Sequence, residues 1–143
     1  MKDERKLGNE SSKNSKNCPQ GVRGKFVRYV FIRDLVLTTL VGVHGHEKNG
    51  QQRVCINLDM DVPEPEEPIQ DKLSEVVCYE EIVLEIRTIV NAGHINLVET
   101  LAERIASKIL SDERISAVRV RIEKLDVFPD AASVGVEIER TRR

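Results

Sequence analysis

Lys124 is the side chain of this sequence whose position most strongly suggests chemistry. It follows the run VRVRIE, from Val118 to Glu123, in which apolar and charged residues alternate, as they do in a half-buried strand. By the same two-residue period, Lys124 falls on the apolar side. A lysine in such a place either reaches a cleft or titrates with a lowered pKa, and working lysines are usually found there. The alternative is that the strand ends at Glu123 and Lys124 turns into solvent.

Three further polar side chains lie near the ends of predicted elements. Glu47 lies in a glycine-rich loop, Tyr79 at the start of one predicted helix and Glu99 near the start of another. Each also has a purely structural explanation: a solvated loop acid for Glu47, a ring packed over the first turn for Tyr79, and a capping box with Asn96 for Glu99. The residues alone leave both kinds of explanation open.

His44, His46 and Glu47 suggest a metal site as another alternative, because alternate residues of an extended segment point the same way. No distant ligand of obvious spacing accompanies them, so no metal is expected. The sequence also lacks the GxGxxG, Walker, GxSxG and HExxH patterns. It therefore offers neither a nucleotide cradle nor the familiar hydrolase signatures.

The predicted strands before the helices are long. From Phe26 to Val43 the residues are rich in β-branched and aromatic types, which predicts a strand with an irregularity near Arg33 and Asp34. The residues from Val54 to Val62 alternate cleanly and predict the antiparallel partner of that strand. From Pro63 to Pro68, prolines interspersed with acids predict a stiff connection that no helix or central strand would tolerate.

Two helices are expected after this connection. The first begins at about Tyr79 and ends at Asn91-Ala92-Gly93, and its apolar residues recur at helical spacing: Ile82, Ile86, Ile89 and Val90. The second has Asn96 as its predicted N-cap and runs through Leu110, with an apolar face made of Leu97, Leu101, Ile105 and Ile109. The strand from Val118 and a last strand ending at Glu139 complete the order.

Two strands, two helices and two strands pack most simply as an α+β domain, with both helices on one face of a four-stranded antiparallel sheet. The other face is expected to be wet, because it receives polar side chains: Asn57, Asp59, Asp61, Arg119, Arg121 and Glu123. The two open edges of such a sheet allow several copies to close edge to edge into a ring. A monomer with charge-protected edges is the alternative.

Composition places the chain among ordinary single-domain proteins. Its 143 residues are 40% hydrophobic but only 3% aromatic, so the core must be aliphatic. No run approaches the roughly 20 apolar residues of a membrane span and the start lacks a secretory signal, so a cytoplasmic location is expected. Cys18, Cys55 and Cys78 are far apart and are expected to be free thiols. A net charge of −2 argues against a general nucleic-acid binder.

Residues 1–25 differ from the remainder in composition. They contain seven Lys or Arg against three acids, many Asn and Ser, and few apolar side chains. This composition predicts a disordered polar and basic tail, followed by one domain over residues 26–143. A basic arm that touches RNA or an acidic membrane surface is the alternative.

Six short stretches together resemble the dihydroneopterin aldolases, a family of folate biosynthesis, over roughly Tyr29 to Arg140. They are FIRDL (Phe31 to Leu35), VGVHGHE (Val41 to Glu47), VCYEEI (Val77 to Ile82), LVETLAERIA (Leu97 to Ala106), RIEK (Arg121 to Lys124) and VGVEIER (Val134 to Arg140). Their order and separation make the resemblance specific. It implies the tunnelling fold, in which subunits close into a ring, usually a tetramer, and two rings stack into an octamer.

The resemblance also implies a reaction, the retro-aldol cleavage of 7,8-dihydroneopterin into 6-hydroxymethyl-7,8-dihydropterin and glycolaldehyde. Glu99 matches the acid that grips the pterin, Val98 a neighbour that contacts the ring, and Glu47 the acid near the hydroxylated tail. Tyr79 matches a phenol that contacts the pterin and tail side of the substrate and is contributed across a subunit boundary, and Lys124 matches the catalytic lysine. Because the C=N bond of the ring receives the electrons, the resemblance implies no metal, no Schiff base and no other cofactor.

Departures from the family pattern leave the substrate preference open. Many relatives have proline directly after the lysine, where this chain has Leu125, and His44 and His46 replace the Tyr and Trp often found in the first motif. One alternative is therefore an epimerase of dihydroneopterin or its triphosphate. Another is a non-catalytic, ring-forming pterin-binding protein.

Overall fold

The computed structural model describes residues 26–42 and 50–142. Over these residues the elements are β1 (Val27–Thr39), β2 (Gln52–Pro63), the 3-10 helix η1 (Leu73–Glu75), α2 (Tyr79–Val90), α3 (Val98–Leu110), β3 (Ala117–Lys124) and β4 (Val134–Thr141). This order confirms the predicted succession of strands and helices and adds η1, which no pattern predicted. The predicted tail, residues 1–25, lies outside the described residues, so the proposed division of the chain stays a prediction.

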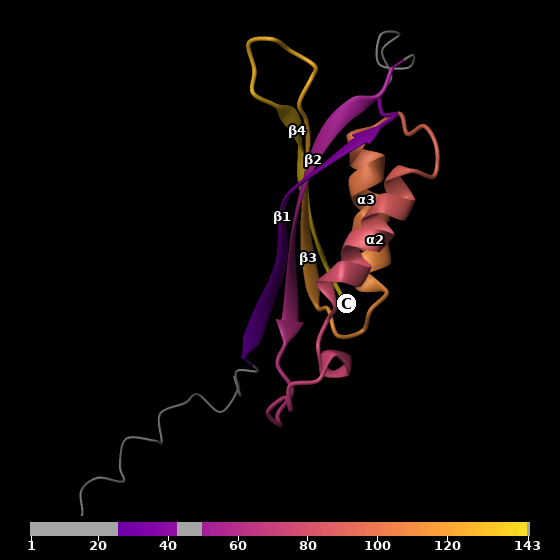
Figure 1. The fold of residues 1–143 in the computed structure, drawn as a ribbon. Helices are drawn as coiled ribbons and strands as arrows, with labels where there is room; N and C mark the ends of the chain where they lie inside the picture. The colour runs from indigo at the N-terminus through magenta and orange to yellow at the C-terminus, as the bar shows by residue number, and fades with distance from the viewer. Residues whose placement is uncertain (1–25, 43–49, 143) are drawn as a thin grey trace, which may run out of the picture.

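The four strands form one antiparallel sheet in the order β1-β2-β3-β4. Both helices lie side by side against one face of it (Figure 1), as predicted, with α3 against β3 and β4 and α2 against β1. In the described part of the chain, no helix is long and apolar enough to cross a membrane. The sheet leaves β1 and β4 at its two edges.

The core lies between the helices and the sheet, and strand parity determines which side chains enter it. Its fully buried members include Ile56, Leu58 and Met60 from β2, Val120 and Ile122 from β3, and Leu101, Ile105 and Ile109 from α3. Burying one such side chain contributes about 1.5–3 kcal/mol. A slip of one residue would turn a whole strand's apolar set toward solvent. The core therefore fixes the register that places Lys124.

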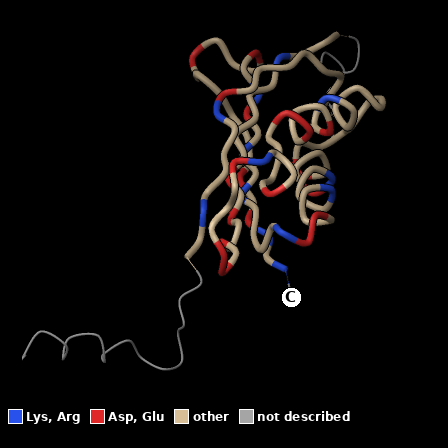
Figure 2. The backbone as a smooth tube through the Cα atoms, turned by 60° about the horizontal axis from the view of Figure 1, so that its bottom comes forward, with Lys and Arg blue, Asp and Glu red and all other residues tan. Residues whose placement is uncertain are grey.

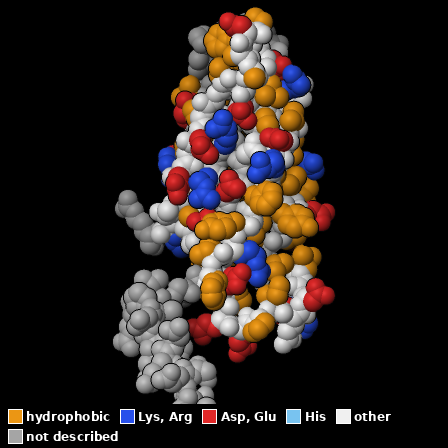
Figure 3. Space-filling view, turned by 90° about the vertical axis from the view of Figure 1, so that its left-hand side faces the viewer, with side chains coloured by type: hydrophobic (Ala, Val, Ile, Leu, Met, Phe, Trp, Pro, Cys, Tyr) orange, Lys and Arg blue, Asp and Glu red, His pale blue; other side chains and the backbone are white. Residues whose placement is uncertain are grey.

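The opposite face of the sheet is polar, as predicted. Arg119 lies 3.4 Å from Asp61 and 3.8 Å from Glu139, and Arg121 makes similar ion pairs with Glu123 and Glu137. Acidic and basic positions are interspersed along the chain (Figure 2), and acidic and basic side chains lie close together on this side of the molecule (Figure 3). Paired charges of this kind keep the face hydrated and unable to serve as a second core.

The predicted irregularity in β1 is confirmed. The pairing of β1 with β2 shifts register between Ile32 and Leu35, and Asp34 has a φ of 54°. Its backbone N–H donates a hydrogen bond of 2.9 Å to Oδ1 of Asn57. This bond compensates for the left-handed conformation, which asparagine and aspartate tolerate better than most residues.

The predicted end of this strand at Val43 is wrong. β1 ends at Thr39, and Val41 instead forms a parallel bridge with Ile95. Two backbone hydrogen bonds hold this crossing, from Ile95 to the carbonyl of Leu40 (3.1 Å) and from Gly42 to the carbonyl of Ile95 (3.0 Å). After β1, the chain thus no longer pairs with β2 and instead hydrogen-bonds to the segment that leads into α3.

The predicted N-cap of the second helix is also wrong. α3 begins at Val98, so Leu97 is the N-cap residue, and no side-chain cap bond forms there. Leu97 is 47% exposed and does not belong to the apolar face, whose other predicted members are buried. The bridge at Ile95 explains the shift, because it holds the entering chain extended and Leu97 keeps φ −120° and ψ 138°. By contrast, α2 begins at Tyr79 and has Asn91 as its C-cap, as predicted.

Gly135 provides a test of the close approach between β3 and β4. It pairs with Glu123, and a Cβ atom there would overlap the backbone carbonyl of Ile122. We expect Gly135→Ala to lower the free energy of unfolding by about 1–3 kcal/mol or more, because backbone cannot move aside cheaply. Urea titration measures this change. Gly50→Ala is the matched control, since nothing lies within 4 Å of its added methyl group; equal unfolding midpoints for the two variants would contradict the close approach.

Candidate active site

A cavity of about 330 Å³ opens at one end of the domain. Its walls are the first turn of α3 with the two residues before it (residues 96–99), the end of β3 with the loop after it (residues 124, 127 and 128) and the start of β4 (residues 134–136). Apolar side chains such as Val98 and Phe128 line it together with Glu99 and Lys124. A largely apolar pocket with a few convergent polar groups is the usual form of a small-molecule site.

Lys124 is placed in this cavity by strand parity. It is the last residue of β3 and pairs with Val54 on one side and Val134 on the other. Its side chain is half-buried and lines the cavity. The expectation that Lys124 continues the apolar row is confirmed, and the alternative that the strand ends at Glu123 is wrong.

Glu99 approaches the same cavity from the helix layer. It lies in the first turn of α3 and lines the cavity next to Val98. The predicted capping box with Asn96 does not form, and none of the described residues donates a hydrogen bond to its carboxylate. The positive end of the helix dipole favours an anion at this place. The carboxylate is therefore available to accept hydrogen bonds from a ligand.

An ion pair that no sequence pattern predicted holds the loop that follows Lys124. The guanidinium of Arg53 donates two hydrogen bonds to the Asp126 carboxylate, of 3.2 Å and 2.8 Å, and the backbone N–H of Arg53 donates a third of 3.1 Å. The N–H of Leu125 donates to the carbonyl of Arg53 at 3.1 Å. Because the bonds between Arg53 and Asp126 join residues 73 positions apart, they fix the chain just beyond Lys124 to a distant strand.

Tyr79 lies in a different cavity of the same copy. It is the first residue of α2, is 67% exposed, and lines a hollow of about 760 Å³ at the β1 edge together with Val77 and residues 28–31. The other end of α2 lies toward the Lys124 end of the sheet. Oγ1 of Thr39 donates to the carbonyl of Val90 at 3.2 Å, and Thr39 pairs with Gln52, two residues before the strand partner of Lys124, Val54. A 12-residue helix is about 18 Å long. One copy therefore brings Lys124, Val98 and Glu99 together but not Tyr79.

Glu47 and the possible metal ligands His44 and His46 lie outside the described residues. Among the residues that the structure describes, no three His, Cys, Asp or Glu side chains form a group that could hold a metal ion. Cys55 in β2 pairs with Glu123 of β3 and is buried on the polar face of the sheet. Burial and the neighbouring Asp34 raise the pKa of its thiol. A raised pKa keeps this thiol protonated and a poor nucleophile.

Comparisons with known proteins point to one family. A family model described as dihydroneopterin aldolase matches residues 30–139. The dihydroneopterin aldolase of Escherichia coli (strain K12) is 29% identical over 111 residues, which cover 78% of this chain and 91% of that protein. Dihydroneopterin aldolase 1 of Arabidopsis thaliana is 33% identical over 108 residues, which cover 71% of this chain and 74% of that protein.

Solved structures agree with the sequence comparisons. The dihydroneopterin aldolase of Burkholderia thailendensis bound to guanine is 38% identical, with a TM-score of 0.72 over 82% of this chain and 93% of that one. The Escherichia coli dihydroneopterin aldolase in complex with neopterin is 28% identical, with a TM-score of 0.73 over 79% of this chain and 98% of that one. The similarity thus extends over nearly the whole length of the two solved structures and about four fifths of this chain.

The pair between Arg53 and Asp126 can be tested by titration. Hydrogen bonds from Arg53 hold the pKa of the Asp126 carboxyl below its ordinary value. We expect Arg53→Gln to raise this pKa toward the ordinary value of an aspartate, measured by NMR on the side-chain carboxyl carbon. Because the folded-state pKa is lowered, the pair stabilises the loop above the ordinary pKa and is lost as the pH falls through the lowered one. An identical Asp126 titration in the variant and in the unaltered protein would show that the pair does not form in solution.

Proposed function

The chain belongs to the dihydroneopterin aldolase family and is an aldehyde-lyase, and we propose that its Lys124 cavity binds 7,8-dihydroneopterin and cleaves the side chain of that substrate. The products are 6-hydroxymethyl-7,8-dihydropterin and glycolaldehyde. The observation that carries this assignment of the site is the meeting of Lys124 with the available carboxylate of Glu99 in one apolar cavity. These two groups have the complementary tasks of moving protons and holding the ring.

Glu99 binds the pterin in this proposal. Neopterin and guanine, which occupy two of the similar structures, share an edge on which an amino group lies beside a ring N–H. A carboxylate matches that edge because its two oxygens accept both hydrogen bonds at once. Val98, which precedes Glu99 in α3 and is only 7% exposed, provides apolar contact for the ring. The cavity thus offers a pterin both a hydrogen-bonding carboxylate and an apolar surface for its ring.

The reaction needs a proton acceptor and a place for the bonding electrons. Loss of the proton from the hydroxyl on the second side-chain carbon turns that carbon into the aldehyde of glycolaldehyde as the carbon–carbon bond breaks. The electron pair passes to the first side-chain carbon and into the adjacent C=N bond of the ring. Protonation of the first carbon then gives the hydroxymethyl product. This route needs one group that removes the hydroxyl proton and one that delivers a proton to carbon.

Lys124 and Tyr79 transfer these protons. The amine of Lys124 acts through a water molecule, and the phenol of Tyr79 from a neighbouring copy assists it at the side-chain hydroxyl. Glu47, which precedes β2 in the sequence, contacts the hydroxylated tail. Lys124 and Tyr79 act where a proton moves, so their loss should affect turnover more than binding, whereas Glu47 is a binding group.

The assembly that completes the site is a ring. The β4 edge borders the Lys124 cavity at residues 134–136, and the β1 edge borders the Tyr79 cavity at residues 28–31. β1 and β4 run in opposite directions in the sheet, so β4 of one copy can pair with β1 of the next and continue the antiparallel order. Repetition closes a tetramer, and two such rings stack into an octamer.

The cytoplasm is the proposed place of the reaction. Cys55 and Cys78 are free cysteines in the described part of the chain. Thiols that are kept reduced are typical of that compartment.

The experiment is incubation with 7,8-dihydroneopterin while glycolaldehyde and the side-chain epimer are measured together. We expect the unaltered protein to release the aldehyde. Lys124→Ala should lower kcat by about 100-fold or more and retain pterin binding, because it removes a proton carrier. Glu99→Ala should weaken pterin binding by about 100-fold, because the ring loses two charge-assisted hydrogen bonds.

One lysine variant and one glutamate variant serve as controls. Lys108→Ala and Glu103→Ala remove exposed charges from α3 that do not line the cavity, and both should leave turnover and binding unchanged. Epimer formation without aldehyde would replace the aldolase assignment with an epimerase, and bound pterin without any product would indicate a binding protein. Near-normal turnover in Lys124→Ala would remove Lys124 from the mechanism.

A further inference from the structure

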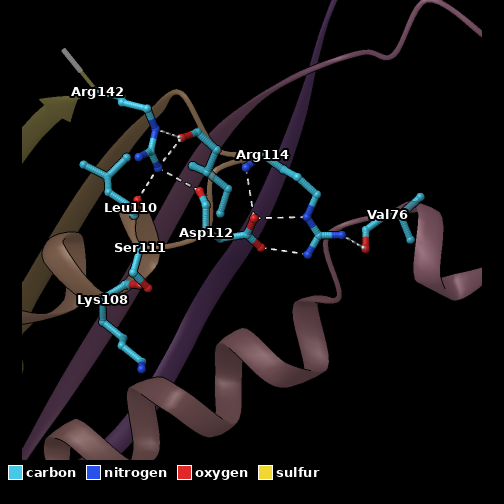
Figure 4. Close-up of polar contacts among 8 residues, drawn as sticks. Val76, Lys108, Leu110, Ser111, Asp112, Arg114 and Arg142 are labelled. Atoms are coloured by element: carbon cyan, nitrogen blue, oxygen red, sulfur yellow. Dashed lines mark hydrogen bonds and ion pairs between the residues drawn. The ribbon is translucent and has the colours of Figure 1, made fainter.

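A hydrogen bond ties the segment just before Tyr79 to the turn between α3 and β3. Nη1 of Arg114 donates to the carbonyl oxygen of Val76 at 2.8 Å, across 38 residues of sequence (Figure 4). The N–H of Val76 donates to the carbonyl of Leu73 in η1 at 3.2 Å. The backbone of Val76 is therefore held on both sides, three residues before Tyr79 begins α2.

Arg114 is itself fixed by Asp112. Its Nε and Nη2 donate to the two oxygens of the Asp112 carboxylate at 3.0 Å and 2.7 Å, and its backbone N–H donates to Oδ1 at 3.0 Å. Such a two-pronged contact fixes the plane of the guanidinium group. The remaining nitrogen, Nη1, is then directed at Val76. These hydrogen bonds also hold the pKa of Asp112 below its ordinary value, so the carboxylate stays ionised.

The turn that carries Asp112 is fixed from the C-terminal end of the chain. Nη2 of Arg142 donates to the carbonyls of Leu110, Asp112 (2.8 Å) and Ile115 (3.2 Å). The carbonyl of Leu110 is the last of α3, and carbonyls at a helix end lack partners within the helix. Figure 4 shows the whole chain of contacts from Arg142 through Asp112 and Arg114 to Val76.

These contacts are better suited to positioning than to stabilising the fold. The side chains of Arg114 and Asp112 are 46% and 29% exposed, and exposed ion pairs contribute only about 0–1 kcal/mol. Arg114, Val76 and Tyr79 nevertheless line the same cavity at the β1 edge. Cys78, the residue that precedes α2, provides no side-chain cap bond to the first turn of α2.

We propose that Arg114, held by Asp112, is a positioning residue that fixes the direction in which Tyr79 enters the neighbouring copy's active site. This inference rests on the proposed function, in which Tyr79 assists proton transfer. A phenol displaced by a fraction of a hydrogen-bond length transfers protons poorly, so the effect of Arg114 on the reaction should pass through Tyr79.

The position of Tyr79 can be measured without reference to catalysis. The chain contains two tyrosines and no tryptophan, so Tyr29→Phe leaves Tyr79 as the only tyrosine fluorophore. In that background we expect Arg114→Ala to speed the depolarisation of Tyr79 fluorescence, because the first turn of α2 gains motion on the order of nanoseconds. Arg140→Ala, which removes another exposed arginine–carboxylate pair, should leave it unchanged. Unchanged depolarisation in Arg114→Ala would overturn the inference.

A kinetic cycle tests the functional half of the inference. We expect Arg114→Ala to lower kcat for 7,8-dihydroneopterin by about 10- to 100-fold with KM nearly unchanged. In a Tyr79→Phe background the same substitution should add no further loss, whereas independent losses would multiply and contradict the inference. Arg114→Lys keeps the charge but cannot hold Asp112 and Val76 with one planar group, so it should cause a partial loss even if the alanine variant folds poorly.

The two outcomes separate this inference from the proposed function. If Tyr79→Phe alone retains full kcat, the proposed role of Tyr79 fails, and the fluorescence result alone decides whether Arg114 positions the ring. If Tyr79→Phe loses activity while Arg114→Ala changes neither fluorescence nor kcat, the proposed function stands and the positioning role is wrong. In that case the burial of Val77, which is only 5% exposed, suffices to hold the segment.

Discussion

The two-residue period of β3 is the constraint on which the site depends. Val120, Ile122 and Lys124 share one face of that strand, and the first two are fully buried beneath the helices. Since a slip of register would expose this apolar row, the energy of the core also determines where the amine of Lys124 points. It is directed to the helix side of the sheet, where the first turn of α3 presents Glu99 at the wall of the same cavity.

The antiparallel course of the two helices has a second consequence for function. α3 begins beside Lys124, whereas α2 ends near it and begins at the far end of the molecule with Tyr79. A single copy thus holds Lys124 and Glu99 in one cavity and Tyr79 in another, and each cavity is bordered by an edge strand of the sheet. In the proposed ring, pairing of β4 of one copy with β1 of the next would bring Tyr79 of one copy to the Lys124 cavity of the other, so ring closure would also complete the proposed site.

Local patterns predicted what depends on neighbours in sequence. Period two placed Lys124 correctly, and the start of α2 at Tyr79 followed from helical spacing. The N-cap at Asn96 was wrong because a distant strand segment, bridged through Ile95, sets the start of α3. Ion pairs that hold the site, such as Arg53 with Asp126, join residues 73 positions apart and carry no periodic signal. The role of Tyr79 rested on resemblance, because nothing near it in sequence points to another copy.

The central claim, that one active site contains Lys124 of one copy and Tyr79 of another, is tested most directly by mixing two inactive variants. Lys124→Ala and Tyr79→Ala are unfolded together in equal amounts and refolded, so that the rings contain both kinds of subunit. Random mixing in a ring of shared sites should give about a quarter of the sites both native groups and restore aldehyde release to that extent. Recovery no greater than the average of the two variants refolded separately would contradict a shared site.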